Sequence, residues 1–187
     1  MKVKTILKLT SGIFAGILLT SINAANAFTA CQVTDLGGVD DKSFNETAWK
    51  GVQSAVSKHG IDSKILESKD GTDYEPHLNS MVGAGCDIII AVGFLMGEAT
   101  QKAAEANPDA KFTIIDFAYD PTIPNVLGQV FATDQAAFLA GYLSAGVSKT
   151  GIVGTFGGIN IPPVTGFMDG FAWGVAHYNK IKGKNVQ

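Results

Sequence analysis

The residues of this sequence that first suggest chemistry lie in one run, Asp35-Leu36-Gly37-Gly38-Val39-Asp40-Asp41-Lys42-Ser43-Phe44-Asn45. The run follows the first apolar segment and opens the first helix-like segment. In an open α/β sheet, ligands bind beside such loops. Its glycines match neither G-x-G-x-x-G nor a P-loop, so a nucleotide phosphate site is not indicated. Two interpretations stay open: a ligand-binding loop, or a glycine-containing turn that carries a solvated pair of aspartates.

A second carboxylate, Asp116, stands directly after the apolar run 112–115. An acid at the carboxyl end of a buried strand is hard to explain as a core residue, so we favour a ligand contact over a solvated turn. Phe94 also follows an apolar run, 87–93. It is interpreted either as a cleft wall or as part of the core.

The other reactive residue types form no catalytic or metal-binding pattern. Three histidines share no spacing with acids, and the surface is their default position: His59, His77 and His177. Ser43, with Glu46 three residues later, is predicted to cap a helix in a capping box, and it has no partner histidine. The pair Asp40-Asp41 alone supplies too few carboxylates for a metal-dependent hydrolase. The sequence therefore predicts no enzymatic activity, no metal and no cofactor.

Strand-like and helix-like segments alternate along the chain and must position these residues. The strand-like segments are 28–34, 63–67, 87–93, 111–117, 126–131 and 151–156, and the helix-like segments are about 44–58, 74–84, 97–106, 134–147 and 162–178. Such alternation predicts an α/β fold in which a parallel sheet is flanked by helices on both faces. The continuous apolar run 88–92 is typical of a central parallel strand.

The charge of the chain argues against nucleic acid as a partner. All 14 basic residues are lysines, against 17 acids, which gives a net charge of −3. Three of those lysines and none of the acids fall in residues 1–27, so the remainder carries −6. Arginine is the usual bidentate partner of phosphate and guanine. An acidic chain without arginine is poorly suited to nucleic acid or to a multiply charged phosphate ligand.

Residues 1–27 have the order of an export signal. Three lysines form a basic start, an apolar stretch runs from about residue 11 to residue 22, and Ala25-Asn26-Ala27 is the small-x-small pattern of a cleavage site. The apolar stretch is shorter than the roughly 20 residues that a membrane-spanning helix needs. We therefore predict cleavage after Ala27 and a periplasmic or other extracytoplasmic location.

The two cysteines, Cys31 and Cys86, allow three interpretations. An exported protein permits a disulfide, but both residues are placed in predicted buried strands, which favours two packed thiols. Cys31 is also a candidate for lipid modification, because Ala30 precedes it. However, Phe28 stands where lipoprotein signals usually carry leucine, so lipid anchoring ranks second to the cleaved signal.

The run from Gly37 to Asn45 resembles the G-G-x-D-D-x-S-F-N signature of the basic membrane protein family, whose best-known members are purine nucleoside receptor A-like lipoproteins. Further segments are similar to that family in the same order: Asp73-Tyr74-Glu75-Pro76, Gly85-Cys86-Asp87-Ile88-Ile89-Ile90-Ala91-Val92-Gly93-Phe94, Phe138-Leu139-Ala140-Gly141-Tyr142-Leu143 and Gly157-Gly158-x-x-Ile161-Pro162-Pro163-Val164. The resemblance covers essentially all of 28–187.

The resemblance implies a periplasmic-binding-protein type I fold with a ligand cleft between two lobes. It implies a substrate-binding protein that captures a purine nucleoside and delivers it to an ABC transporter permease in the membrane. We expect a monomer, with a signal at 1–27, a first lobe at 28–131 and the start of a second, truncated lobe at 132–187. Alternatives are a ligand-sensing module or a nucleoside-processing enzyme on the same scaffold.

The resemblance also implies which residues contact the ligand. Aromatic rings would hold the base, while carboxylates and amides would bind its polar edge and the ribose hydroxyls. The expected set is Asp41 and Asn45 for polar edges, Phe44 or Trp49 for stacking, Phe94 as a cleft wall, Asp116 for the base, and Gly157 and Gly158 for close backbone approach. Trp49 is interpreted equally well as a packing residue.

Overall fold

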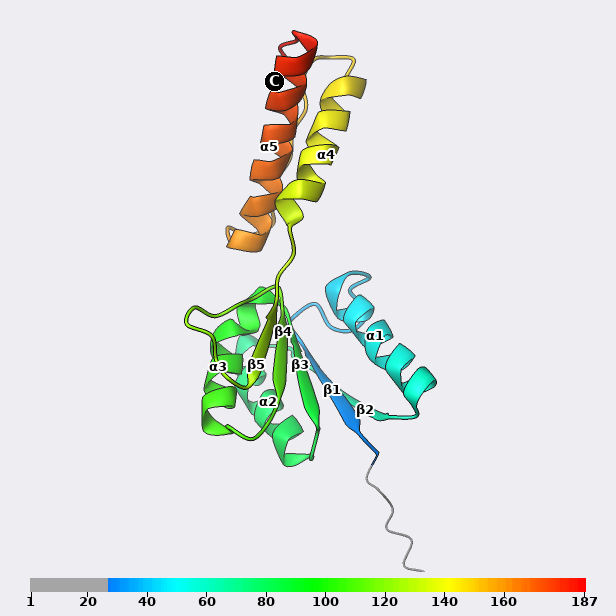
Figure 1. Cartoon of the computed structure of the whole chain (residues 1–187), viewed down its shortest axis with the longest axis vertical. Coiled ribbons are helices and arrows are strands. Elements are labelled where there is room, and N and C mark those ends of the chain that lie inside the picture. Colours follow the sequence, from blue (N-terminus) through cyan, green and yellow to red (C-terminus); the bar gives the residue numbers. More distant parts are fainter. Residues whose placement is uncertain (1–26) are drawn as a thin grey trace, which may run out of the picture.

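The computed structural model describes residues 27–187, in which a sheet of five strands is followed by two long helices (Figure 1). The strands are β1 (Thr29–Thr34), β2 (Asp62–Glu67), β3 (Ile88–Val92), β4 (Phe112–Ile115) and β5 (Val126–Gln129). The helices are α1 (Phe44–His59), α2 (Tyr74–Gly83), α3 (Gly97–Ala106), α4 (Thr133–Val147) and α5 (Pro162–Lys182), and 3₁₀ turns η1 (Gly71–Asp73) and η2 (Phe94–Met96) precede α2 and α3. These elements agree closely with the predicted ones.

The predicted strand at 151–156 is wrong, because these residues belong to a mostly exposed loop between α4 and α5. Two backbone hydrogen bonds join this segment to the end of the chain: the Val153 N–H donates to the Gln187 carbonyl, and the Gln187 N–H donates to the Gly151 carbonyl. A strand needs an extended neighbour along its length. A single paired residue does not build a ladder.

The five strands are all parallel, in the order β2-β1-β3-β4-β5. β1 lies in the interior of the sheet, where Cys31 is level with Lys64 of β2 on one side and with Ile89 of β3 on the other. Helix α1 covers one face, and α2 and α3 cover the other (Figure 1). The chain turns in opposite directions after β1 and β3, which is where such sheets open a crevice at their C-terminal edge.

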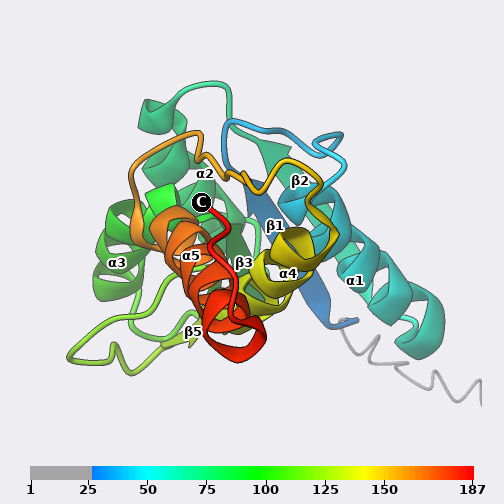
Figure 2. The ribbon, with the colours of Figure 1, turned by 90° about the horizontal axis from the view of Figure 1, so that it is seen from above.

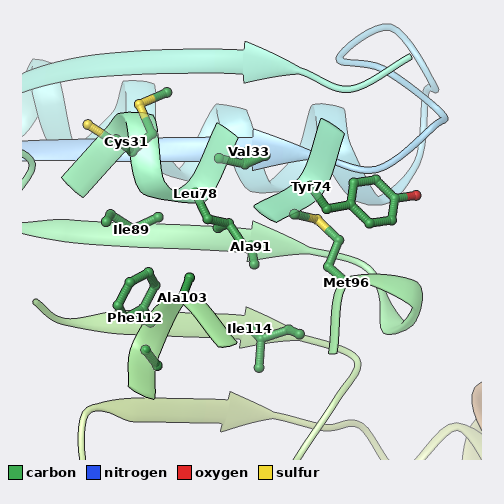
Figure 3. Packing of buried hydrophobic residues seen from close by; sticks show 12 residues of the cluster. Cys31, Val33, Tyr74, Leu78, Ile89, Ala91, Met96, Ala103, Phe112 and Ile114 are labelled. Atoms are coloured by element: carbon green, nitrogen blue, oxygen red, sulfur yellow. The ribbon is translucent and has the colours of Figure 1, made fainter. Parts of the chain in front are cut away.

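The hydrophobic core lies between the sheet and the pair α2 and α3 (Figure 3). Alternate residues of three strands face it, and they meet apolar side chains of both helices and of η2: Cys31, Val33, Tyr74, Leu78, Met81, Ile89, Ala91, Met96, Ala103, Ala104, Phe112 and Ile114. Burying one such side chain the size of leucine stabilises the fold by roughly 1.5–3 kcal/mol. This packing fixes α2 and α3 on the sheet, and with them the loops that precede them.

Cys31 and Cys86 form a disulfide, with their Cα atoms 6.0 Å apart, so the prediction of two packed thiols is wrong. Cys86 lies on the turn that leaves α2 and not in a strand. Because Cys31 faces α2, that turn passes within the distance that a disulfide spans. The two residues are 55 apart in the sequence. Closing a loop of this length stabilises the folded chain by roughly 4 kcal/mol if the effect is entropic.

Asp41 caps the N-terminus of α1, and the predicted capping box at Ser43 is wrong. The Asp41 carboxylate accepts hydrogen bonds from the backbone N–H groups of Ser43 (2.9 Å), Asn45 (2.9 Å) and Glu46 (3.1 Å). The Ser43 side chain makes no cap bond. A carboxylate is a better cap than the Ser43 hydroxyl because its bonds to the N–H groups are charge-assisted and because the helix dipole favours an anion.

Asn45 ties the capped end of α1 to the end of β1. Its side-chain nitrogen donates to the carboxylates of Asp35 (2.7 Å) and Asp41 (3.1 Å), and its backbone carbonyl accepts from the Gln32 side chain (3.0 Å). Asn45 is only 1% exposed. Part of the loop that was predicted to bind a ligand is therefore a buried polar network that fixes where α1 begins.

Helices α4 and α5 run parallel and touch along three glycines. A Cβ atom at Gly174 would collide with the Phe138 carbonyl, one at Gly141 with the Phe171 carbonyl, and one at Gly170 with the backbone of Asp134. Only glycine permits backbones to approach so closely. The two helices therefore form one closely packed unit, which we call the α4/α5 pair.

The α4/α5 pair leaves apolar side chains in solvent. Leu139, Leu143 and Val147 follow each other at four-residue spacing on α4 and are 69%, 64% and 66% exposed. Spacing of four places them on one face of the helix. Across residues 27–187, no helix combines the length and the hydrophobicity needed to cross a bilayer.

We predict that Gly174→Ala loosens the α4/α5 pair. The new methyl group meets the rigid backbone of α4, so the free energy of unfolding should fall by about 1–3 kcal/mol despite the better helix propensity of alanine. Urea denaturation followed by circular dichroism measures the change. Gly51→Ala is the matched control, because a Cβ at this helical position of α1 has open space around it. It should raise stability slightly, and a loss equal to that of Gly174→Ala would contradict the close contact.

A second prediction concerns the Asp41 cap. Partial burial alone would raise the pKa of Asp41, but the backbone N–H donors of Asn45, Glu46 and Ser43 outweigh it and lower this pKa. A lowered pKa means that the cap stabilises the fold at neutral pH and is lost as the pH falls through the folded-state value.

Asp41→Ala should therefore reduce the free energy of unfolding by about 1–2 kcal/mol near pH 7, and the difference from wild type should shrink in acid. Denaturation at a series of pH values checks this. The neighbouring Asp40 is exposed, so Asp40→Ala serves as the control. A pH-independent loss, or an equal loss in both variants, would rule out the carboxylate cap.

Candidate functional site

Two cavities lie at the C-terminal edge of the sheet, below the α4/α5 pair, and they share the wall formed by Asp116, Phe131 and Thr133. Figure 1 shows the α4/α5 pair rising away from this edge, and Figure 2 looks down on the edge with the pair in front of it, seen roughly end-on. The Phe94 cavity, of about 450 Å³, is lined by Phe94, Asp116, Phe117, Ala118, Val130, Phe131, Thr133, Pro162 and Pro163. The Phe44 cavity, of about 480 Å³, is lined by Ser43, Phe44, Thr47, Ala48, Ile115, Asp116, Phe131, Thr133 and Phe167.

The backbone conformation of Asp116 explains why this residue lies at the centre of the site. It follows β4 directly with a φ of 71°, a left-handed conformation that is uncommon for residues other than glycine. Its N–H donates to the Gln129 carbonyl at the end of β5 (2.8 Å). Strand pairing thus holds the residue while the chain turns sharply, and the turn presents its side chain to both cavities.

The Asp116 carboxylate is half-buried, and this burial raises its pKa above the ordinary value for aspartate. Within residues 27–187, no hydrogen bond to its oxygens is found. A partly desolvated carboxylate with free acceptor positions binds N–H or O–H donors strongly, because such bonds are charge-assisted and little water competes for them. Asp116 therefore has acceptor positions that no donor among the described residues occupies.

Aromatic rings on one side of Asp116 support each other. The ring of Phe94 lies 5.0 Å from that of Phe117, which lies 4.9 Å from that of Tyr119. The Tyr119 hydroxyl donates to the Gly97 carbonyl at the start of α3 (2.7 Å), and burial raises its pKa to about 12. The Tyr119 phenol stays neutral at physiological pH and keeps its hydrogen bond to the Gly97 carbonyl. This bond holds the end of the row of three rings against α3.

The rest of the wall comes from residues that the sequence analysis did not select. Phe131 lies in the segment that leads from β5 to α4, while Pro162, Pro163 and Phe167 belong to the first turns of α5. The helical periodicity of the sequence predicts which residues of α5 lie on the same face as Phe167. It does not predict that this face meets the C-terminal edge of the sheet.

The structure brings together three of the predicted ligand-binding residues, Phe44, Phe94 and Asp116. Asp41 and Asn45 lie behind them in the cap network described above. Their predicted contact with the ligand, like that of the other predicted residues, stays a prediction.

Like Asp41 and Asn45, the predicted residues Trp49, Gly157 and Gly158 line neither cavity. Trp49 is half-buried on α1. Gly157 and Gly158 lie in the exposed loop before α5, and a side chain at Gly157 would collide with Val164. In this structure Gly157 thus allows the loop to pack against α5.

A larger hollow, of about 670 Å³, lies elsewhere, between the starts of α2 and α3. Its charged residues are largely engaged with each other, since Lys102 forms an ion pair with Glu98 (2.7 Å). One of its polar groups, the Tyr74 hydroxyl, is buried without a hydrogen-bond partner among the described residues, but Tyr74 is also the one aromatic residue that lines this hollow. Size alone does not make it the better site, and we place the candidate site at Asp116.

The arrangement at Asp116 suits a flat ligand that carries hydrogen-bond donors. Phenyl faces stand on both sides of one carboxylate, and no lysine lines either cavity. Aromatic faces bind planar rings through dispersion and stacking, while the carboxylate selects donors. In residues 27–187, no three histidine, cysteine, aspartate or glutamate side chains are grouped as they would be around a metal ion.

Comparison with known proteins identifies the family of this chain. Residues 28–182 match the family Bmp, described as ABC transporter substrate-binding protein PnrA-like. Basic membrane protein A of Borreliella burgdorferi is 38% identical over 146 residues, which are 77% of this chain and 43% of that protein. The ABC transporter nucleoside-binding protein BmpA of Lactococcus lactis subsp. cremoris is 34% identical over 159 residues, 83% of this chain and 45% of that protein.

Among solved structures, the chain resembles an ABC transporter solute-binding protein from Aeropyrum pernix K1, with a TM-score of 0.75 and 29% identity. The similarity covers 86% of this chain and 46% of that one. The prediction of a periplasmic-binding-protein fold is thus confirmed, and the chain spans less than half the length of the relatives it matches. Since the match to the family extends over nearly all of the described residues, the chain belongs to the PnrA-like substrate-binding proteins of ABC transporters.

Proposed function

We propose that this chain supplies one wall of a purine nucleoside site in an extracytoplasmic ABC transporter substrate-binding protein. In this proposal the base lies between the phenyl rings around Asp116, and the carboxylate accepts hydrogen bonds from its N–H groups. The complete protein acts as a monomer that hands the nucleoside to a membrane permease.

The observation that carries this proposal is the state of Asp116, a half-buried carboxylate without a hydrogen bond from the described residues, set between Phe94, Phe117, Phe44 and Phe131. A second support is the Lactococcus lactis relative, which is a nucleoside-binding protein of an ABC transporter. The division into a first lobe at 28–131 and a second lobe from 132 onward also belongs to this proposal. It is supported by the position of the cavities, which combine residues from both sides of that boundary.

We further propose that the chain is exported and cleaved after Ala27. The signal itself lies outside the described residues, but the start of β1 supports this position. The Phe28 carbonyl accepts from the Asp62 N–H (2.9 Å), and the Thr29 N–H donates to the Asp87 carboxylate (2.7 Å). Cleavage just before Cys31 would remove these contacts and the first residues of β1. A lipid attached to the Cys31 sulfur would also exclude the disulfide.

The role of Asp116 is tested by Asp116→Asn. Replacing the charged acceptor should weaken nucleoside binding by about 1.5–3 kcal/mol, the range for a hydrogen bond to a charged group. Nucleoside monophosphates should bind at least about tenfold more weakly than nucleosides to the wild type, because their phosphate meets the carboxylate in a partly desolvated site. The substitution should narrow this difference. Calorimetry with adenosine, inosine and guanosine and with their monophosphates gives each value.

Asp40→Asn is the matched control, since it removes the same charge from an exposed position in the loop before α1. It should leave nucleoside affinity unchanged. Equal affinity for a nucleoside and its monophosphate, or unchanged binding by Asp116→Asn, would remove Asp116 from the site and overturn the proposed contact.

Processing is tested by the intact mass of the exported protein, which should correspond to a chain that begins at Phe28. Ala27→Phe should block cleavage at this position, because signal peptidase requires a small residue there. Cys31→Ala should leave processing and release from the membrane unchanged. A mass that includes a diacylglyceryl group at Cys31 would show that the protein is lipid-anchored instead.

A further inference from the structure

The Cys31–Cys86 disulfide joins two sulfurs in very different surroundings. Cys31 is fully buried in β1, under α2, where Leu78 and Ile89 pack in the same layer (Figure 3). Cys86 is only partly buried and lies on the turn after α2, next to the exposed residues Gly85 and Asp87. Cys86 is therefore the partly exposed end of the bond, with its sulfur 3.9 Å from the Met81 sulfur, while Cys31 is the fully buried end.

We propose that Cys86 is the sulfur through which external thiols and disulfides form and break this bond, and that Cys31 acts only as its internal partner. Thiol–disulfide exchange requires the attacking sulfur to approach in line with the bond that breaks. In this proposal, attack on Cys86 opposite Cys31 comes from the side of the partly exposed turn after α2. Attack on Cys31 opposite Cys86 would have to come through the packed layer between the sheet and α2.

Oxidation then follows a fixed order, with a disulfide such as oxidised glutathione as the oxidant. The Cys86 thiol loses its proton to solvent and attacks one glutathione sulfur, the glutathione disulfide breaks, and one glutathione thiolate leaves and takes up a proton. Cys31, deprotonated in turn, attacks the Cys86 sulfur and expels the second glutathione. Two protein thiols are oxidised by two electrons, and one glutathione disulfide is reduced to two thiols.

The structure holds the reacting turn in place while this occurs. The Lys64 ammonium donates to the Ala84 carbonyl (2.8 Å), and the Cys86 N–H donates to the Met81 carbonyl (3.2 Å). Lys64 is also level with Cys31 across the β1–β2 pair. The turn is thus tied to α2 and to β2 independently of the disulfide, so Cys86 should remain close to Cys31 in the reduced protein. The second step would then be an exchange between neighbouring sulfurs.

The first test uses two single-cysteine variants of the whole chain. Cys31→Ala leaves Cys86, and Cys86→Ala leaves Cys31. With oxidised glutathione under native conditions, Cys86 should form its mixed disulfide at least roughly tenfold faster than Cys31, because only Cys86 is accessible. In denaturant the two thiols should react at similar rates. Equal native rates, or a faster Cys31, would overturn the proposal.

The second test needs no variant and therefore does not depend on how well the variants fold. The oxidised wild-type chain is treated briefly with reduced glutathione, quenched in acid, alkylated and digested. Mass spectrometry should find glutathione on the peptide that contains Cys86 and the alkyl group on Cys31. Glutathione mainly on Cys31, or equally on both, would show that the first attack does not come from the side of the turn.

Discussion

The pairing of β1 with both β2 and β3 is the constraint on which the rest of this structure depends. It places the ends of parallel strands at one edge of the sheet. It also sets the direction in which each following loop leaves that edge. The polar network of Asp35, Asp41 and Asn45, the rings after β3 and the sharp turn at Asp116 are consequences of this arrangement. Each lies where a strand has ended.

The alternating pattern of elements was readable from the sequence because it depends on local periodicity. The run 88–92 predicted an interior strand, and it is β3. Asp116 was predicted to contact the ligand from its position directly after a strand. The structure adds that its carboxylate is half-buried. The disulfide was missed because it depends on where a turn passes a neighbouring strand. Phe131 and Phe167 were missed because they reach the site only through the placement of α4 and α5 over the sheet.

The error at Ser43 shows how two local rules compete. Serine followed by glutamate is a recognised cap pattern, yet Asp41 lies two residues earlier on a loop that curls back over the start of α1. Its two oxygens satisfy three N–H groups, more than one hydroxyl reaches. The same curl draws Asn45 inward. Asp41 and Asn45 look like exposed ligand groups in the sequence, but their hydrogen bonds hold in place the loop that carries them.

The glycine contacts of the α4/α5 pair have a mechanical consequence. Two helices whose backbones touch cannot slide or splay easily, so the pair behaves as a stiff rod. The short segment 130–132 joins this rod to the last strand. Helix α5 has 21 residues, which makes the rod about 32 Å long. A rotation of about 10° at the joint would therefore carry the far end through about 6 Å. Phe131, which lies at the pivot, also forms a wall of both cavities. A bound molecule that displaces the Phe131 ring would therefore act next to the joint, and the resulting displacement would be largest at the far end of the α4/α5 pair.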